Sequence, residues 1–199
     1  MAVGLFMSIK SSFIPEAWAA AESLVNGVNR GLTRLGFPRY LDPEPPPDVY
    51  RGSLFGRSSL DHHSARILAL FGAVAARHGD APHLSLLESN PYRVVYLPID
   101  LPLPFQTGFE DLIGGVATEI SAGSAPRLQR ELSEIAGSLG IPLESGELSD
   151  SVAARLNNQE KFSESDSPAL VDDYRTAWLL LYEGARLAQQ HSTALALAG

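Results

Sequence analysis

The chain has 199 residues, of which 45% are hydrophobic and 19% are charged, a composition typical of a globular protein. It contains no cysteine, which excludes disulfides, thiolate metal sites and cysteine nucleophiles and favours a reducing, cytoplasmic location. There is no apolar run of 18 or more residues and no secretory-signal pattern at the N-terminus, so we expect no membrane partner. No linker divides the sequence, and we expect a single globular domain over residues 1–199.

Strands and helices alternate along the first half of the chain. Short apolar runs rich in β-branched residues indicate strands, and apolar residues spaced by three and four indicate helices. Proline near a helix start and glycine after its end set the boundaries. The predicted elements are a strand at 3–9, a helix at 15–36, a proline-rich loop at 37–57, a helix at 58–78, and a hairpin with strands at 83–87 and 93–97.

The second half is predicted to be mainly helical. Thr107 and Glu110 have the spacing of a capping box, which predicts a helix running towards Ile120. Ser167 and Pro168 have the residue types of an N-cap and a first helical position, and they predict the start of the final helix. The remaining predicted elements are a helix at 128–139, a short helix at 150–158, an exposed loop at 157–168 and a last strand at 193–197. The whole pattern predicts a mixed α/β fold, with a small, mostly buried sheet of about three or four strands packed with five or six helices.

The net charge of −8 is carried entirely by residues 101–199, which hold six basic and fourteen acidic residues. Residues 1–100 are balanced, with nine of each sign. An acidic surface repels nucleic-acid phosphates and attracts a basic protein surface, although an acidic excess also simply keeps a domain in solution. Eight acidic residues lie between positions 144 and 173: Glu144, Glu147, Asp150, Glu160, Glu164, Asp166, Asp172 and Asp173.

The segment PYRVVYLPIDLPLPF ends in an extended, proline-rich arm. Pro98, Pro102 and Pro104 prevent this arm from continuing the preceding strand as a central strand. The arm either wraps the domain's own core or presents Leu103 and Phe105 to a partner.

The sequence contains no nucleotide-binding glycine pattern and no nucleophile-elbow motif. Asp61, His62 and His63 are adjacent, whereas helical metal ligands are spaced by three or four, so capping and packing roles are favoured over a metal or general-base role. His78 and His191 lie near predicted helix ends, where a histidine interacts favourably with the helix dipole. Glu183 is predicted to pair with Arg186. We therefore expect no catalytic residue, no metal and no cofactor.

Three parts of the chain resemble bacterial immunity proteins, the small cytosolic inhibitors encoded beside secreted antibacterial toxins. They are the acidic stretch 144–173, the run RVVYLPIDLPLPF and the terminal YRTAWLLLYEGARLAQQHSTALALA. The resemblance implies a stoichiometric protein–protein inhibitor without catalysis.

Three functional hypotheses follow from the sequence. The first is a non-enzymatic binding module in the cytoplasm that covers a basic protein partner, such as a cognate toxin, and does not bind nucleic acid. Its predicted contact residues are the eight acidic residues of 144–173 together with Leu103 and Phe105. The second is a small metal-dependent hydrolase using Asp61, His62 and His63, and the third is a structural subunit of a homo-oligomer.

Overall fold

The computed structural model describes residues 4–43, 93–110 and 117–198. The described residues form one five-stranded sheet and four α-helices, together with short 3₁₀ segments and one π-helical segment. The strands are β1 (Gly4–Met7), β2 (Arg93–Leu97), β3 (Phe105–Glu110), β4 (Ala117–Ser124) and β5 (Leu195–Ala198). The helices are α1 (Trp18–Arg34), α4 (Ala125–Ala136), α5 (Asp150–Asn157) and α6 (Thr176–Gln190), and the π-helical segment is η5 (Leu170–Arg175).

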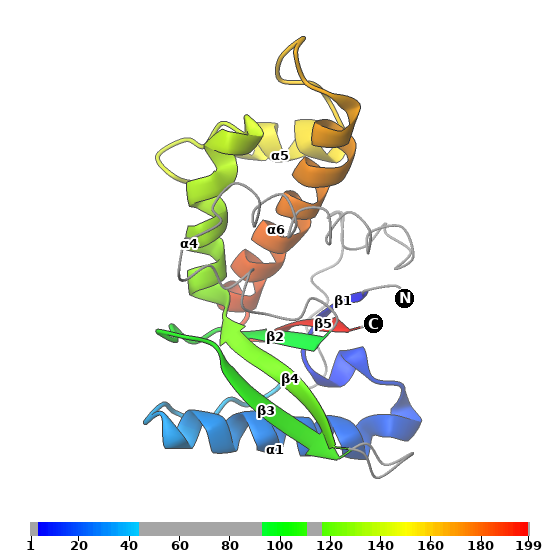
Figure 1. The fold of residues 1–199 in the computed structure, drawn as a ribbon, viewed down its shortest axis with the longest axis vertical. Coiled ribbons are helices and arrows are strands. Elements are labelled where there is room, and N and C mark those ends of the chain that lie inside the picture. Colours follow the sequence, from blue (N-terminus) through cyan, green and yellow to red (C-terminus); the bar gives the residue numbers. More distant parts are fainter. Residues whose placement is uncertain (1–3, 44–92, 111–116, 199) are drawn as a thin grey trace.

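The sheet has the strand order β1-β5-β2-β4-β3, with β2 and β4 parallel and the other neighbours antiparallel. It lies between two helical layers, with α1 on one side and the pair α4 and α6 on the other (Figure 1). Helices α4 and α6 extend away from the sheet, and α5 lies at their far end. The molecule is therefore elongated, with α1 and α5 near its two ends.

Alternation along β2 explains why both faces of the sheet are covered. Val94 and Tyr96 pack into the core beneath α4 and α6, whereas Val95 and Leu97 pack into the core against α1. Successive side chains of a strand point to opposite faces, so an apolar run such as Val94–Leu97 requires packing on both sides. On the α6 side, the indole N–H of Trp178 donates to the carbonyl oxygen of Leu132 at 2.8 Å and ties α6 to α4.

Two glycines allow α1 to lie directly against β3. A Cβ atom at Gly27 would be 2.7 Å from the carbonyl oxygen of Gly108, and one at Gly31 would be 2.1 Å from the ring of Phe105. Any larger residue at these positions would push the helix and the strand apart. The glycines thus set the separation of α1 from the sheet.

The mixed α/β prediction is confirmed, although the described sheet has five strands rather than three or four and the described α-helices number four rather than five or six. The predicted strands at 3–9, 93–97 and 193–197 and the helices at 15–36, 128–139 and 150–158 are present. The predicted helix from Thr107 is wrong, because β3 and β4 pair there as antiparallel strands. The predicted elements at 58–78 and 83–87 lie outside the described residues.

The final helix begins as predicted, because helical backbone starts at Pro168 and continues through η5 into α6. No helix in the described ranges is long and apolar enough to cross a membrane.

The close approach of α1 to β3 predicts that Gly27→Ala destabilises the fold. Overpacking destabilises a fold by about 1–3 kcal/mol, whereas the better helix propensity of alanine stabilises it by about 1 kcal/mol. We therefore expect the free energy of unfolding to fall by about 1 kcal/mol. Urea denaturation measures the change. The matched control is Gly137→Ala, since a Cβ atom there meets nothing within 4 Å. An equal loss of stability in both variants would contradict this account.

Candidate functional site

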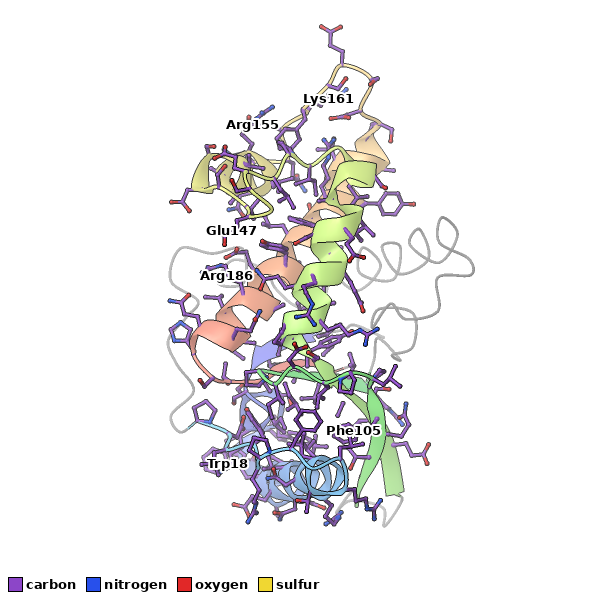
Figure 2. All side chains as sticks on the ribbon, turned by 90° about the vertical axis from the view of Figure 1, so that its left-hand side faces the viewer. Trp18, Phe105, Glu147, Arg155, Lys161 and Arg186 are labelled. Carbon is purple, nitrogen blue, oxygen red and sulfur yellow. The ribbon has the colours of Figure 1, made fainter. Side chains whose placement is uncertain are left out.

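Five of the predicted contact residues are exposed on α5 and on the loops that precede and follow it. This group is called the acidic end, and Figure 2 shows its surroundings through the labelled Glu147, Arg155 and Lys161. Its members come from three consecutive segments of chain and are spread over twenty-one positions of sequence. The acidic end consists of Glu144, Glu147, Asp150, Glu160 and Glu164.

A tight turn places Glu144 and Glu147 side by side. Each backbone N–H donates to the other residue's carbonyl oxygen, at 2.9 and 3.0 Å. Ser145 and Gly146 have φ angles of 54° and 84°, the positive values that a type I′ turn requires at both central positions. Leu143 and Leu148 flank the turn and pack on the core, which leaves the two glutamates exposed. Directly opposed carboxylates repel each other, and the turn holds them together despite this repulsion.

Two cations, Arg155 and Lys161, lie within the sequence span of the acidic end, and Arg155 is already occupied. The Arg155 guanidinium lies 4.1 Å from the centroid of the Phe162 ring, donates to the carbonyl oxygen of Lys161 at 2.8 Å and pairs with Glu160 at 3.3 Å. Arg155 therefore holds the loop after α5 in place while partly neutralising Glu160. In contrast, Glu144, Glu147 and Glu164 form no ion pair with any residue that the structure describes, whereas Asp150 interacts electrostatically with Arg186.

A buried ion pair stabilises the loops that precede and follow α5. The Arg175 guanidinium, from the end of η5, lies 2.5 Å from the Asp166 carboxylate, and both side chains are almost completely buried. Arg175 also donates to the carbonyl oxygen of Leu139 at 2.8 Å. Asp166 accepts from the backbone N–H groups of Phe162 and Ser163 at 2.8 and 3.0 Å. One arginine thus joins the end of α4, the loop after α5 and the start of α6.

These contacts stabilise the charged form of Asp166. Its hydrogen bond with Arg175, helped by the backbone N–H groups of Ser163 and Phe162, lowers the pKa of Asp166 to about 2, against the opposing effect of burial. Asp166 was predicted to contact a partner, but its carboxylate is turned inward and fully used within the fold. It is therefore not part of the acidic end.

The other predicted contact residues do not join the acidic end. Leu103 is exposed, but it lies on the arm between β2 and β3, next to the sheet. Phe105 packs against Gly31 of α1, far from α5 (Figure 2). Asp172 and Asp173 lie on η5, and the structure does not describe their side chains. The arm contributes Leu101 to the core, so wrapping of the domain's own core accounts for Leu101 and Phe105.

Within the described ranges, no three acidic or histidine side chains come together as a metal site would require. Asp61, His62 and His63 lie outside the described residues, and the hydrolase hypothesis built on them stays a prediction. His191 follows the last residue of α6, as predicted for a histidine at a helix end. The predicted pair of Glu183 and Arg186 is confirmed, with two hydrogen bonds of 2.9 and 2.6 Å.

Sequence reasoning missed two features that shape this site. One is the turn, although the dipeptide Ser145-Gly146 between two leucine–glutamate pairs is a recognisable turn signal. The other is Arg175, because nothing local distinguishes a buried arginine from an exposed one. Its partners Leu139 and Asp166 are 36 and 9 residues away in the sequence.

A comparison with protein-family models matches residues 52–197 to a family described as "Putative DNA-mimic protein". Neither the curated proteins nor the solved structures contain a significant match to the chain. The matched range includes the whole acidic end.

The family match corrects the predicted partner. A DNA-mimic family implies a DNA-binding protein, so the predicted basic partner of toxin type is wrong. The homo-oligomer alternative stays a prediction. The resemblance to toxin-immunity proteins is likewise replaced, because the matching family is a different one. The expectation that the chain does not itself bind nucleic acid is compatible with a DNA mimic, since such a protein occupies the place of DNA.

The buried ion pair predicts a large effect of Arg175→Leu. The substitution leaves Asp166 buried without a cation and removes the donor to Leu139. We therefore expect the free energy of unfolding to fall by about 3 kcal/mol. The control on the same helical segment is Arg186→Leu, which breaks an exposed pair and costs about 0–1 kcal/mol. Chemical denaturation of both variants makes the comparison, and similar losses would show that the buried pair has no special role.

The low pKa of Asp166 predicts how stability depends on pH. The pKa of Asp166 is about 2 in the folded state and about 3.9 in the unfolded state. At pH values between these two, the unfolded chain therefore binds more protons than the folded one. The contribution of Asp166 is therefore complete above about pH 4 and lost as the pH falls towards 2. Denaturation curves of the native chain and of Asp166→Asn should differ most near neutral pH and converge near pH 2. A constant difference across this range would contradict the assignment.

Proposed function

The chain belongs to the putative DNA-mimic protein family, and from this membership we propose that it binds a DNA-binding protein at the site where that protein otherwise holds DNA. The acidic end is the proposed contact surface, with Glu144, Glu147, Asp150, Glu160 and Glu164 in the place of phosphates. The observation that carries the proposal is the exposed pair Glu144 and Glu147, which a tight turn holds side by side without a countercharge among the described residues.

Carboxylates can replace phosphates because both are anionic oxygen acceptors. Arginine forks bind either group through paired hydrogen bonds, and lysine binds either as a point charge. A DNA-binding site recognises the backbone mainly through such contacts, which carry no sequence information. A mimic therefore needs spaced negative charges on a firm surface, and it does not need to reproduce base edges.

Rigidity matters as much as charge for this role. Each flexible side chain that becomes ordered on binding reduces the affinity, so a mimic benefits from a backbone that is already ordered. The type I′ turn, the Arg155 contacts and the buried pair of Arg175 and Asp166 supply that order at the acidic end.

The proposal includes two further statements. The protein acts as a single domain in the cytoplasm, where DNA-binding proteins are accessible and where a chain without cysteine is suited to the reducing conditions. It acts by stoichiometric binding, so the fraction of the partner that is blocked depends on the amount of this protein and not on the time of incubation. Leu103, exposed on the arm, is proposed as an apolar contact only for a partner large enough to reach the sheet.

The experiment is capture of proteins from a lysate of the host on the immobilised chain, followed by elution with duplex DNA and mass spectrometry. A protein that is displaced by DNA, and whose own DNA binding is blocked by the free chain, supports the proposal. Capture of proteins that duplex DNA does not displace, or of none, would overturn it.

The acidic-end assignment predicts that Glu144→Gln with Glu147→Gln weakens binding to that partner by about tenfold or more, through the loss of charge-assisted hydrogen bonds. Isothermal titration calorimetry at low ionic strength measures the change. The matched control is Glu16→Gln with Glu22→Gln, which removes the same charge from exposed positions of the α1 layer. If the control weakens binding equally, net charge rather than the acidic end is responsible.

A further inference from the structure

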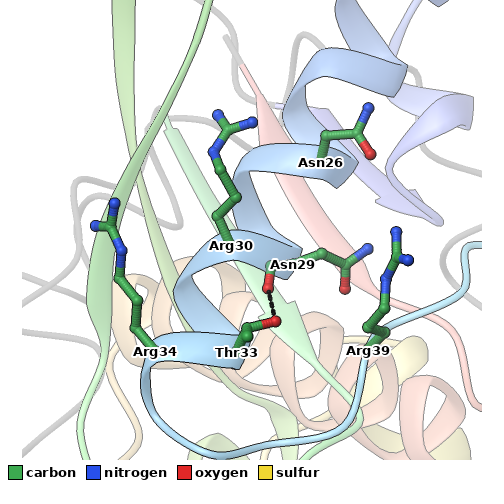
Figure 3. A pocket seen from close by; sticks show the side chains of 6 residues that line it. All are labelled: Asn26, Asn29, Arg30, Thr33, Arg34 and Arg39. Carbon is green, nitrogen blue, oxygen red and sulfur yellow. Dashed lines mark hydrogen bonds between the residues drawn. The ribbon is translucent and has the colours of Figure 1, made fainter.

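A cavity of about 450 Å³ that is wide open to solvent lies along α1 (Figure 3). Helix α1 is at the opposite end of the described structure from α5 (Figure 1). A volume of this size is typical of sites for small ligands. Helix α1 also precedes residue 52, where the family match begins, so the cavity is outside the family-matched region. The residues lining it are Asn26, Asn29, Arg30, Thr33, Arg34 and Arg39.

Helical spacing and one chain reversal place three arginines around the cavity. Asn26, Arg30 and Arg34 are four residues apart and share one face of α1. Gly36, with φ of 77°, ends the helix in a Schellman motif, in which the N–H of Phe37 donates to the carbonyl oxygen of Leu32 at 2.9 Å. The chain then turns back along α1 and carries Arg39 to the cavity.

A buried clamp fixes the returning segment next to Arg39. The amide of Asn29 donates to the carbonyl oxygen of Tyr40 at 3.0 Å and accepts from its N–H at 2.7 Å. The hydroxyl of Tyr40 accepts from the N–H of Ala194 at 2.9 Å and donates to Asp42. Because Asn29 and Tyr40 are both buried, the backbone beside Arg39 is held to the helix and to the chain entering β5.

Among the described residues, no carboxylate neutralises the charge of the cavity. No carboxylate of the described residues forms an ion pair with Arg30, Arg34 or Arg39, although the protein as a whole has a net charge of −8. Like charges four residues apart destabilise a helix, so Arg30 and Arg34 repel each other until an anion is bound. Guanidinium groups bind phosphate oxygens through paired hydrogen bonds, and Asn26 adds an amide donor.

We propose that this cavity binds a small phosphorylated ligand through Arg30, Arg34 and Arg39. A compact anion suits the site better than a nucleic-acid strand, because the three arginines line one cavity of limited volume while the net charge of the protein repels a long polyanion. The site is independent of the acidic end, so the chain can bind an anion at one end and a partner at the other.

Titration calorimetry of the full chain with inorganic pyrophosphate at low ionic strength tests the proposal. We expect saturable binding of one pyrophosphate, weakened about tenfold, or 1.4 kcal/mol, by Arg34→Gln or by Arg39→Gln. The control is Arg93→Gln, which removes an exposed arginine at the start of β2 and should leave binding unchanged. All these positions are exposed, and circular dichroism melting curves verify that each variant is folded.

Three results would overturn the proposal: no saturable binding, equal weakening by Arg93→Gln, or tighter binding of a sixteen-nucleotide single strand than of pyrophosphate. The last result would assign the arginines to a nucleic-acid surface instead. The Glu144→Gln and Glu147→Gln double variant should bind pyrophosphate normally. This result separates a failure of the cavity proposal from a failure of the DNA-mimic proposal.

Discussion

The buried ion pair of Arg175 and Asp166 is the constraint on which the outer part of the molecule depends. Removing two charges from water is costly, and such a pair is maintained only when further hydrogen bonds satisfy both groups. Leu139, Phe162 and Ser163 supply those bonds through their backbones, so the cost is offset only when three chain segments meet in one arrangement. The pair therefore selects a single geometry for the loops of the acidic end, which an apolar contact of similar size would not do.

Charge is distributed unevenly over the two ends of the molecule. At the α5 end, exposed carboxylates outnumber cations, and Arg155 is used within the fold. At the α1 end, Arg30, Arg34 and Arg39 are grouped around one cavity. Such a separation orients the protein in the field of a charged partner before contact, which speeds a correctly oriented encounter. In the proposed complex, the acidic end faces the DNA-binding site of the partner, and α1 lies at the other end of the described structure.

The elements predicted correctly from the sequence are those whose local pattern agrees with their tertiary environment. The apolar run of β2 and the glycine that ends α1 are examples. The segment from Thr107 was misread because a capping-box spacing arises by chance in a strand whose cross-strand partner, β4, is made largely of small and polar residues. Sheet pairing decided its structure, and pairing depends on residues distant in sequence.

The candidate site was predictable in composition but not in arrangement. Counting charges located the acidic residues of 144–173, yet it could not separate Asp166 from Glu164, which are two positions apart. The difference depends on Arg175, and only the folded chain brings that residue to Asp166. The arginine cavity was missed for the same reason, because Arg39 reaches α1 only after the reversal at Gly36 and the clamp of Asn29 on Tyr40.

The same chemical group thus has opposite roles in the two loops that precede and follow α5. A carboxylate that is buried and fully hydrogen-bonded, as in Asp166, stabilises the fold and cannot contact a binding partner. A carboxylate that is exposed and unpaired, as in Glu144 and Glu147, repels its neighbours and lowers stability, but it remains free to bind a cation of another protein. A phosphate-like surface therefore requires a frame strong enough to hold mutually repelling charges in place. The inward-facing acid at 166 contributes to that frame, and the outward-facing acids depend on it.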